Sequence, residues 1–536
     1  MHRRLLETVA SVAAILAPAC GAAQQRPAVA EPPRLVVLIT VDQLKEDYFD
    51  TYASQLTGGL ARLARGGAFF TNAFQDHAIT ETAPGHASTL SGRFPRSTGI
   101  VRNSAGVNDP QSPLVGGPGP GASPFRFRGG TLTDWLRTAD PEVRALSVSR
   151  KDRGAILPLG RAHQEAYWYS TNGNFVTSTY YADTLPTWVQ RFNARRTAQS
   201  MAGKEWALLR PASAYAERDS VPAESGGRDF VFPHRLPSDP DSAARFFADY
   251  PFMDQLTLDL ALEGVRTLRL GAGPHTDVLA VSLSTTDAVG HRYGPDSREI
   301  HDQILRLDQM LGVFIDSLYT LRDSTQVVFA LTADHGVSPL PEVRAASPAA
   351  AAAAHVSLDS LASAFSKSLA GRGVGAGALS FEDGILLVNY PAFTRARVNA
   401  DSVVRAFRAA ALRNPGVARA DLISALATKD TVGDAVTRRW LHMIPRDQPI
   451  PLGVTLKPGH VWGGSGSAHH GQPSDQDAHV PVIFYGPPFQ PGRYATFARV
   501  VDIAPTLAWV TGVEPTEPLD GRILRAALRK PPAAPA

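Results

Sequence analysis

Cysteine is nearly absent from this chain, with Cys20 the single one among 536 residues. An intramolecular disulfide and a thiolate zinc finger are therefore excluded, and any metal ion must be held by histidines and carboxylates. Long hydrophobic runs are also missing, since the apolar stretch from Val9 to Leu16 is too short to span a membrane. The net charge is only +3 and no run of lysine and arginine is interleaved with aromatics, so we do not expect nucleic-acid binding.

The remaining composition is that of a globular protein. Hydrophobic residues make up 44% of the chain and charged residues 19%, with many glycines and prolines for loops. At about 150 residues per domain the length allows roughly three folding units, although one large α/β domain with insertions fits equally well.

The N-terminus is typical of an export signal. A basic start, His2-Arg3-Arg4, precedes the short apolar stretch, and small residues follow it. We predict a signal peptide over residues 1–23 of an exported bacterial protein. Cys20 stands where a lipoprotein carries its acylated residue, so two outcomes stay open: a lipid-anchored protein, or a cleaved periplasmic one.

Several apolar runs have the length of buried strands. They are Leu35 to Val41, Ala145 to Val148, Val278 to Leu283, Val327 to Leu331 and Val480 to Tyr485. Continuous rather than alternating apolar runs indicate strands covered on both faces, so we predict an α/β fold with a mainly parallel central sheet and helices on both faces. We expect a core in two parts, 30–350 and 431–530, around a small inserted α/β cap, 351–430, and a frayed tail, 531–536.

Carboxylates and histidines follow or precede these strands. Asp42 ends the first run, Asp334-His335 follows another, and His470 precedes the last. Asp287 and His291 follow a further run, and we expect Gly290 to allow a turn that brings both side chains to one ion. Ligands bind beyond the carboxyl ends of strands in open α/β sheets, so these residues are candidates for one site.

Each of these residues alone is more often a cap, a turn or a surface residue. Their joint placement at four strand ends favours a two-metal centre instead. Oxygen and nitrogen ligands without sulfur suit zinc in a catalytic setting.

A nucleophile is available in the segment Thr82-Ala-Pro-Gly-His86. Thr82 lies two residues before Pro84, so its hydroxyl is expected at a helix N-terminus, where backbone N–H groups favour an anion. A metal ion would lower the pKa of this hydroxyl and activate it. The alternative is that Thr82 is only a helix cap. We expect His86 to support the site or to pack beside it.

The ordered motifs resemble the alkaline phosphatase superfamily, in its type I phosphodiesterase/nucleotide pyrophosphatase branch. The resemblance runs from about Arg34 to Arg522 and includes the closing segments Asp502-Ile-Ala-Pro-Thr506 and Asp520-Gly-Arg522. It implies two zinc ions, one held by Asp42, Thr82, Asp334 and His335 and the other by Asp287, His291 and His470.

Lys151-Asp-Arg153 and Asn103 resemble the phosphate-contacting residues of the phosphate-irrepressible bacterial alkaline phosphatases. A guanidinium, an ammonium and an amide together favour the dianion of a monoester. Alternatively, Lys151 and Arg153 lie in a solvated turn.

The resemblance implies hydrolysis of small phosphate monoesters through a phosphothreonine at Thr82. A phosphodiesterase with the same two zinc ions and a non-catalytic phosphate-binding surface protein stay open as alternatives.

Overall fold

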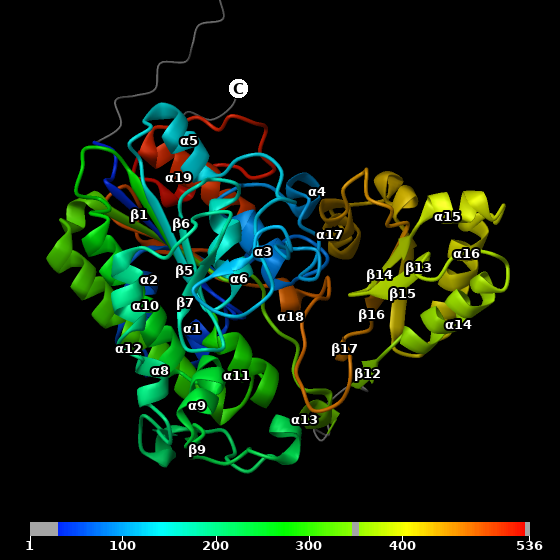
Figure 1. The fold of residues 1–536 in the computed structure, drawn as a ribbon, viewed down its shortest axis with the longest axis horizontal. Helices are drawn as coiled ribbons and strands as arrows, with labels where there is room; N and C mark the ends of the chain where they lie inside the picture. Colours follow the sequence, from blue (N-terminus) through cyan, green and yellow to red (C-terminus); the bar gives the residue numbers. More distant parts are fainter. Residues whose placement is uncertain (1–30, 346–352, 531–536) are drawn as a thin grey trace, which may run out of the picture.

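A ten-stranded sheet forms the centre of the computed structural model, which describes residues 31–345 and 353–530 (Figure 1). The strand order is β19-β2-β18-β11-β1-β10-β5-β6-β7-β4. The bounds of these strands, in the same order, are Gly492–Tyr494, Ala68–Phe70, Val482–Tyr485, Val327–Thr332, Leu35–Val41, Asp277–Leu283, Ala145–Ser149, Glu165–Tyr169, Phe175–Ser178 and Leu114–Val115.

The middle of the sheet is parallel. Strand β1 pairs in parallel with β10 and β11, β10 pairs with β5, and β5 pairs with β6. Every residue of β1, β10 and β11 is buried, as expected for strands covered on both faces. Helices α10 (Phe252–Thr267) and α12 (Arg298–Leu321) lie on one side of the sheet, and α3 (Thr82–Thr89) and α19 (Ile503–Thr511) lie on the other (Figure 1). The predicted fold class is confirmed.

Strand β18 runs antiparallel to β11, with Val482 opposite Thr332. In an antiparallel pair one strand begins where the other ends. The start of β18 therefore lies at the same sheet edge as the carboxyl ends of β1, β10 and β11. This topology explains how His470, which precedes β18, reaches the residues that follow the parallel strands.

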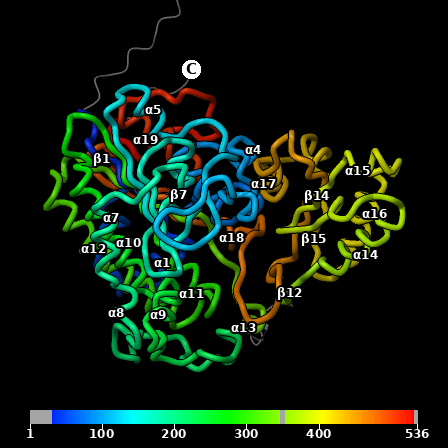
Figure 2. Tube along the Cα trace, viewed as in Figure 1, coloured from blue at the N-terminus to red at the C-terminus, as the bar shows by residue number. Residues whose placement is uncertain are grey.

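A second unit, the cap, comprises residues 354–462 and lies beside the core (Figure 2). Its four-stranded antiparallel sheet has the order β13-β14-β16-β15. The elements of this unit include β13 (Leu379–Glu382), β14 (Ile385–Val388), β15 (Val417–Leu422), β16 (Leu452–Leu456), α14 (Asp359–Ala370), α16 (Ala400–Ala411) and α17 (Ala435–Met443). The unit has a hydrophobic cluster of its own, in which Phe407, Leu386 and Val454 are buried.

The cap extends past residue 430, where the sequence analysis ends it. Strand β16 belongs to the cap sheet because it pairs with both β14 and β15. The chain enters through β12 (Ala354–Val356) and leaves through β17 (His460–Trp462), and these two short strands pair in parallel. The second part of the core therefore begins after residue 462.

The predicted signal peptide with Cys20, and the predicted frayed tail, lie outside the described residues. Within residues 31–345 and 353–530, none of the helices combines the length and the apolar character needed to cross a membrane.

Candidate functional site

Two buried carboxylates follow neighbouring strands. Asp42 comes directly after β1 and Asp334 lies two residues after β11, and both are fully buried. His335 lies between them: its Nε2 atom is 3.3 Å from Asp42 Oδ1 and 3.6 Å from Asp334 Oδ2. The structure thus brings these three predicted ligands together.

The second group is built on helix α11 (Thr285–Tyr293), which follows β10. Asp287 and His291 are one helical turn apart, and His291 Nε2 lies 3.1 Å from Asp287 Oδ1. His470 Nε2 lies 3.6 Å from the same oxygen and 3.2 Å from His291 Nε2. The expected turn at Gly290 is wrong, since this residue is helical. The absence of a side chain there makes room for Gln43, because a Cβ atom would lie 1.8 Å from Gln43 Oε1 and would require that side chain to move.

The donor atoms fit bound cations. The structure contains two groups of potential ligand atoms. One group comes from Asp287, His291 and His470, and the other from Asp42, Asp287 and His335. Within each group the atoms lie within 4.8 Å of one another. Among the described residues, His335 Nε2 and both carboxylate oxygens of Asp42 are buried and make no hydrogen bond of normal geometry, although His335 lies 3.3 Å from Asp42 Oδ1 and the Lys151 ammonium forms an ion pair with Asp42 Oδ2. Buried polar atoms normally have partners, and a metal ion would supply them here.

Each histidine is oriented from behind by a backbone carbonyl. His291 Nδ1 lies 2.6 Å from the carbonyl oxygen of Ala468, and His335 Nδ1 lies 2.9 Å from that of Gly336. His470 Nδ1 lies 2.8 Å from the carbonyl oxygen of Thr80. A donated Nδ1–H leaves Nε2 as the lone-pair nitrogen, which is the form that binds metal. Burial, together with neighbouring His335, lowers the pKa of His470 to about 3 and keeps this ring neutral.

Thr82 is the first residue of helix α3, as the sequence predicts, and it is 1% exposed. The helix lies directly against the end of β11, because a Cβ atom on Gly85 would lie 2.2 Å from the carbonyl oxygen of Asp334. The N–H of Ala83 donates to Asn103 Oδ1 at 2.8 Å. Since this oxygen caps the helix, the group that Asn103 can offer a ligand is its side-chain NH2.

Lys151 lies at the centre of the site. It follows β5 and precedes the short helix α6 (Asp152–Ile156). Its Nζ atom is 3.3 Å from Thr82 Oγ1, 2.5 Å from Asp42 Oδ2 and 2.7 Å from Asp287 Oδ2. Burial opposes the ionised form of Asp287, but Lys151 and His291 outweigh it and hold the pKa of this carboxyl well below its usual range.

Arg153 is not brought into contact with Thr82 or Lys151. Its Nη1 atom lies 3.4 Å from Asp152 Oδ1, and its Nε atom is buried without a hydrogen-bond partner among the described residues. Burial and Asp383 raise the pKa of Glu81, and the positive charge of Arg153 opposes this rise. Arg153 therefore borders the site from the side of Glu81.

Sequence reasoning missed the structural role of Gln43. Its Nε2 atom donates to Asp287 Oδ1 at 2.9 Å and its backbone N–H donates to Asp334 Oδ1 at 3.2 Å. This residue has a left-handed φ of 67°, which turns the chain sharply after Asp42. A polar residue directly after a predicted ligand was the available signal.

His86 supports the site, as expected. Its Nδ1 atom lies 2.9 Å from the carbonyl oxygen of Thr82 and 3.1 Å from Asp334 Oδ2, and its Nε2 atom lies 2.8 Å from Ser282 Oγ.

Glu81 was also missed by the sequence analysis. Its Oε2 atom accepts the backbone N–H of Asn103 at 2.7 Å. Burial and the nearby Asp383 raise its pKa to about 8.

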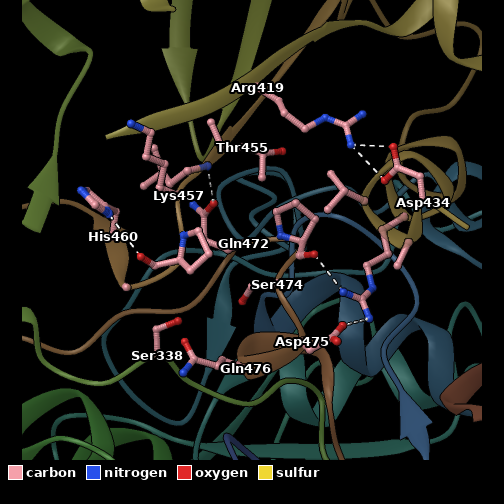
Figure 3. Close-up of a pocket in the computed structure, with 18 of the residues that line it drawn as sticks. Ser338, Arg419, Asp434, Thr455, Lys457, His460, Gln472, Ser474, Asp475 and Gln476 are labelled. Carbon is pink, nitrogen blue, oxygen red and sulfur yellow. Dashed lines mark hydrogen bonds and ion pairs between the residues drawn. The ribbon is translucent and has the colours of Figure 1, made fainter. Parts of the chain in front are cut away.

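A separate cleft of about 510 Å³ opens between the cap and the core (Figure 3). Thr455, Lys457 and His460 line it from the cap, and Gln472 and Ser474 line it from the loop that follows His470. None of the predicted metal, nucleophile or phosphate residues lines this cleft.

Residues 36–361 match the type I phosphodiesterase / nucleotide pyrophosphatase family. The chain belongs to this family. Of the predicted site residues, all but His470 fall within the matched range.

Similar proteins include other members of the alkaline phosphatase superfamily. Alkaline phosphatase PhoV of Synechococcus elongatus is 36% identical over 58% of this chain and 60% of its own length. A Myroides odoratus protein named calcium-transporting ATPase is 30% identical over 90% of this chain and 92% of its own length. The crystal structure of alkaline phosphatase PafA superposes with a TM-score of 0.85 at 25% identity, covering 93% of this chain and 99% of that one.

Proposed function

We propose that this family member is an exported, zinc-dependent alkaline phosphatase that hydrolyses small phosphate monoesters through a phosphothreonine at Thr82. One observation carries the proposal: the Thr82 hydroxyl, at the start of α3, lies 3.3 Å from the ammonium of Lys151, which also contacts Asp42 and Asp287. The names of PhoV and PafA support the same activity.

The residues present fit two zinc ions. Asp42, Thr82, Asp334 and His335 would hold one, and Asp287, His291 and His470 would hold the other. Bound zinc lowers the pKa of a coordinated hydroxyl and stabilises negative charge on a departing oxygen. The two groups of potential ligand atoms, each within 4.8 Å of one another, support this assignment.

Thr82 performs the first half of the proposed reaction. The Thr82 hydroxyl gives up its proton to water, Oγ1 forms a bond to phosphorus as the bond to the leaving oxygen breaks, and the leaving alkoxide takes up a proton from water to become the alcohol. The ammonium of Lys151 favours the ionised hydroxyl and attracts the transferred group. Water then attacks the phosphothreonine, which releases phosphate and restores Thr82, so free phosphate is expected to inhibit as a product.

Lys151, Asn103 and Arg153 are proposed to select the monoester. A monoester dianion concentrates more charge on its non-bridging oxygens than a diester does, so cationic and amide donors favour it. The family description also covers phosphodiesterases, and a diesterase with the same centre is the second candidate.

A paired rate assay tests the proposal. Zinc-loaded protein without residues 1–23 is given an aryl phosphate monoester and the matching diester at mildly alkaline pH, with a chelated sample as the control. A large monoester preference that chelation abolishes supports the phosphatase. A preference for the diester favours the second candidate, the phosphodiesterase. If neither substrate is turned over, a non-catalytic phosphate-binding protein is favoured.

Export remains part of the proposal. It rests on the basic and apolar N-terminal segment, and Cys20 allows a lipid anchor. Fractionation of a bacterial host, with mass analysis of the mature N-terminus, separates a lipidated form from a cleaved periplasmic one.

A further inference from the structure

The cleft between the cap and the core is built around one short turn. Residues 457–460 lead from β16 into β17 and line the cleft from the cap, and residues 472–476 line it from the core (Figure 3). Its volume of about 510 Å³ is enough for a small molecule. Since no step of the proposed reaction uses this cleft, its side chains are free to serve another purpose.

Gln472 brings an unused hydrogen-bond donor to the cleft. The residue is 4% exposed, and its Oε1 atom accepts the backbone N–H of Leu456 at 3.1 Å. This bond fixes the orientation of the amide, because a rotated amide would place its NH2 group against another donor. Within residues 31–345 and 353–530, Nε2 is buried and has no hydrogen-bond partner. Buried donors normally have an acceptor, so this amide needs one from a bound molecule.

Two cations of the cleft lie at the same turn. Lys457 belongs to the turn and is exposed. Arg344 approaches the turn from the core, since a Cβ atom on Gly459 would lie 3.6 Å from Arg344 Nε and 3.7 Å from its Cζ. Neither cation has an acidic partner in the part of the chain that the structure describes. Two positive charges at one turn repel each other, and a bound anion would relieve this repulsion.

The acidic side chains of the cleft are already paired with other cations. Asp434 accepts Nη1 of Arg419 with both oxygens, at 2.9 and 2.7 Å, and Asp475 accepts Nη2 of Arg439 at 2.7 Å (Figure 3). These pairs balance their own charges. The excess positive charge of the wall therefore comes from the two cations at the turn.

We propose that this cleft binds a dianionic phosphate group, held by the Gln472 amide, the Lys457 ammonium and the Arg344 guanidinium. Two cations match the two negative charges of phosphate, whereas a carboxylate carries only one, and the amide adds a directed hydrogen bond. The inference goes beyond the proposed catalytic activity, because it assigns a second, non-catalytic phosphate site. Free phosphate and the phosphate of an organic molecule share this chemistry, and Leu456 and Pro458 offer apolar wall to an organic substituent.

Isothermal titration calorimetry with inorganic phosphate tests the site on the zinc-loaded chain. Lys457→Gln removes one charge, and Gln472→Glu replaces the donor while it retains an oxygen for the N–H of Leu456. We expect each variant to weaken phosphate binding in the cleft about tenfold or more. The melting temperature of each variant checks that it is folded.

Two substitutions serve as matched controls. Lys367→Gln removes the same charge from an exposed position of α14, and Gln476→Glu adds a negative charge at an exposed position of the same cleft. Each should weaken phosphate binding less than about threefold, because exposed charges are screened by solvent and salt. Equal weakening by Lys457→Gln and Lys367→Gln would overturn the site, as would phosphate binding that is unchanged in both Lys457→Gln and Gln472→Glu.

Product inhibition separates this site from the catalytic centre. Phosphate should inhibit monoester hydrolysis by the natural protein and by Lys457→Gln with constants that differ less than about twofold, because Lys457 takes no part in the reaction. A tenfold difference would overturn the assignment of a separate site. If the chain hydrolyses no monoester but loses phosphate binding in Lys457→Gln, the proposed function fails and the cleft site is supported.

A second titration, with phenylphosphonate, distinguishes the two sources of phosphate. Its carbon–phosphorus bond is not a phosphate ester, so the probe is not a substrate of the proposed reaction. Binding that is lost in Lys457→Gln and is tighter than that of inorganic phosphate supports the site and indicates an organic phosphate. Binding that is lost in the same variant but is no tighter supports the site and indicates free phosphate. Phenylphosphonate binding that Lys457→Gln leaves unchanged counts against the site.

Discussion

The Nζ atom of Lys151 lies 3.3 Å from Oγ1 of Thr82. This contact joins the end of β5 to the start of α3. Strands β11, β1, β10 and β5 are successive neighbours in the sheet, and they are followed in turn by Asp334, Asp42, Asp287 and Lys151. The order of the strands thus places the lysine next to Asp287, which belongs to both groups of potential ligand atoms, and within 3.3 Å of the Thr82 hydroxyl.

Thr82→Ala removes the attacking oxygen and should lower turnover by roughly three orders of magnitude or more, while Thr82→Ser retains part of it. Bound zinc, measured by atomic emission, should be unchanged in Thr82→Ala because six other ligands remain. Substantial turnover by the alanine variant would contradict the phosphothreonine route.

Arg153→Ala should lower kcat/KM for a monoester about 10- to 100-fold and affect the matching diester less, since a charge-assisted hydrogen bond is worth about 1.5–3 kcal/mol. The measurement is kcat/KM for both substrates, with Arg153→Lys as the charge-conserving control. Equal losses of kcat/KM on both substrates would show that Arg153 does not recognise the monoester dianion.

Gly85→Ala tests the contact between α3 and β11. A Cβ atom would lie 2.2 Å from the Asp334 carbonyl oxygen, so the helix must move away from the strand end. A displacement of about 1 Å at a reacting atom can cost about 100-fold in rate, and we expect a loss of at least that size. Gly375→Ala is the control and should be fully active, because no atom of the described residues, apart from the chain neighbours of Gly375, lies within 4 Å of the new methyl.

Removal of metal should lower both activity and stability. A ligand that binds only the folded state adds about 2.7 kcal/mol to the free energy of unfolding at about 100 times its Kd. Chelated protein should therefore unfold at a lower temperature in calorimetry, and added zinc should restore the Tm and the turnover together. A Tm that does not respond to zinc would contradict the assignment of Asp42, His335 and their neighbours as ligands.

Glu224→Gln should change how stability depends on pH. Burial, with nearby Glu299 and Asp219, raises the pKa of Glu224 from 4.5 to about 9. Between these values the folded protein holds a proton that the unfolded chain has released, so this group makes the free energy of unfolding fall as pH rises. The glutamine variant should be more stable than the natural protein at pH 8 and equal to it at pH 4. If the difference in Tm between the two proteins is the same at every pH from 4 to 8, the raised pKa of Glu224 is contradicted.

The centre of the fold was predictable because its signals are local. Buried parallel strands are continuous apolar runs, and the residues after them meet at one sheet edge whatever the loops between them do. Asp42, Asp334 and His335 could be placed together for this reason. Thr82 could be placed at a helix start from the proline two residues later.

The remaining parts depend on contacts between distant segments. Strand β16 belongs to the cap because it pairs with β14 and β15, and no local pattern near residue 430 indicates this pairing. The ion pair between Arg102 and Glu382 joins residues about 280 positions apart and exists only in the folded chain. The contact between Gly290 and Gln43 also joins distant segments, so the local sequence does not reveal it.

The parallel pairing of β12 with β17 means that the two ends of the cap meet. A segment whose ends are already adjacent adds little to the entropic cost of folding the core, however long it is. The family match, which ends at residue 361, stops soon after β12. The junction is therefore a natural point of exchange: another module could replace the whole insertion, provided that the contacts of α17 and of the β13–β14 hairpin with the core are rebuilt.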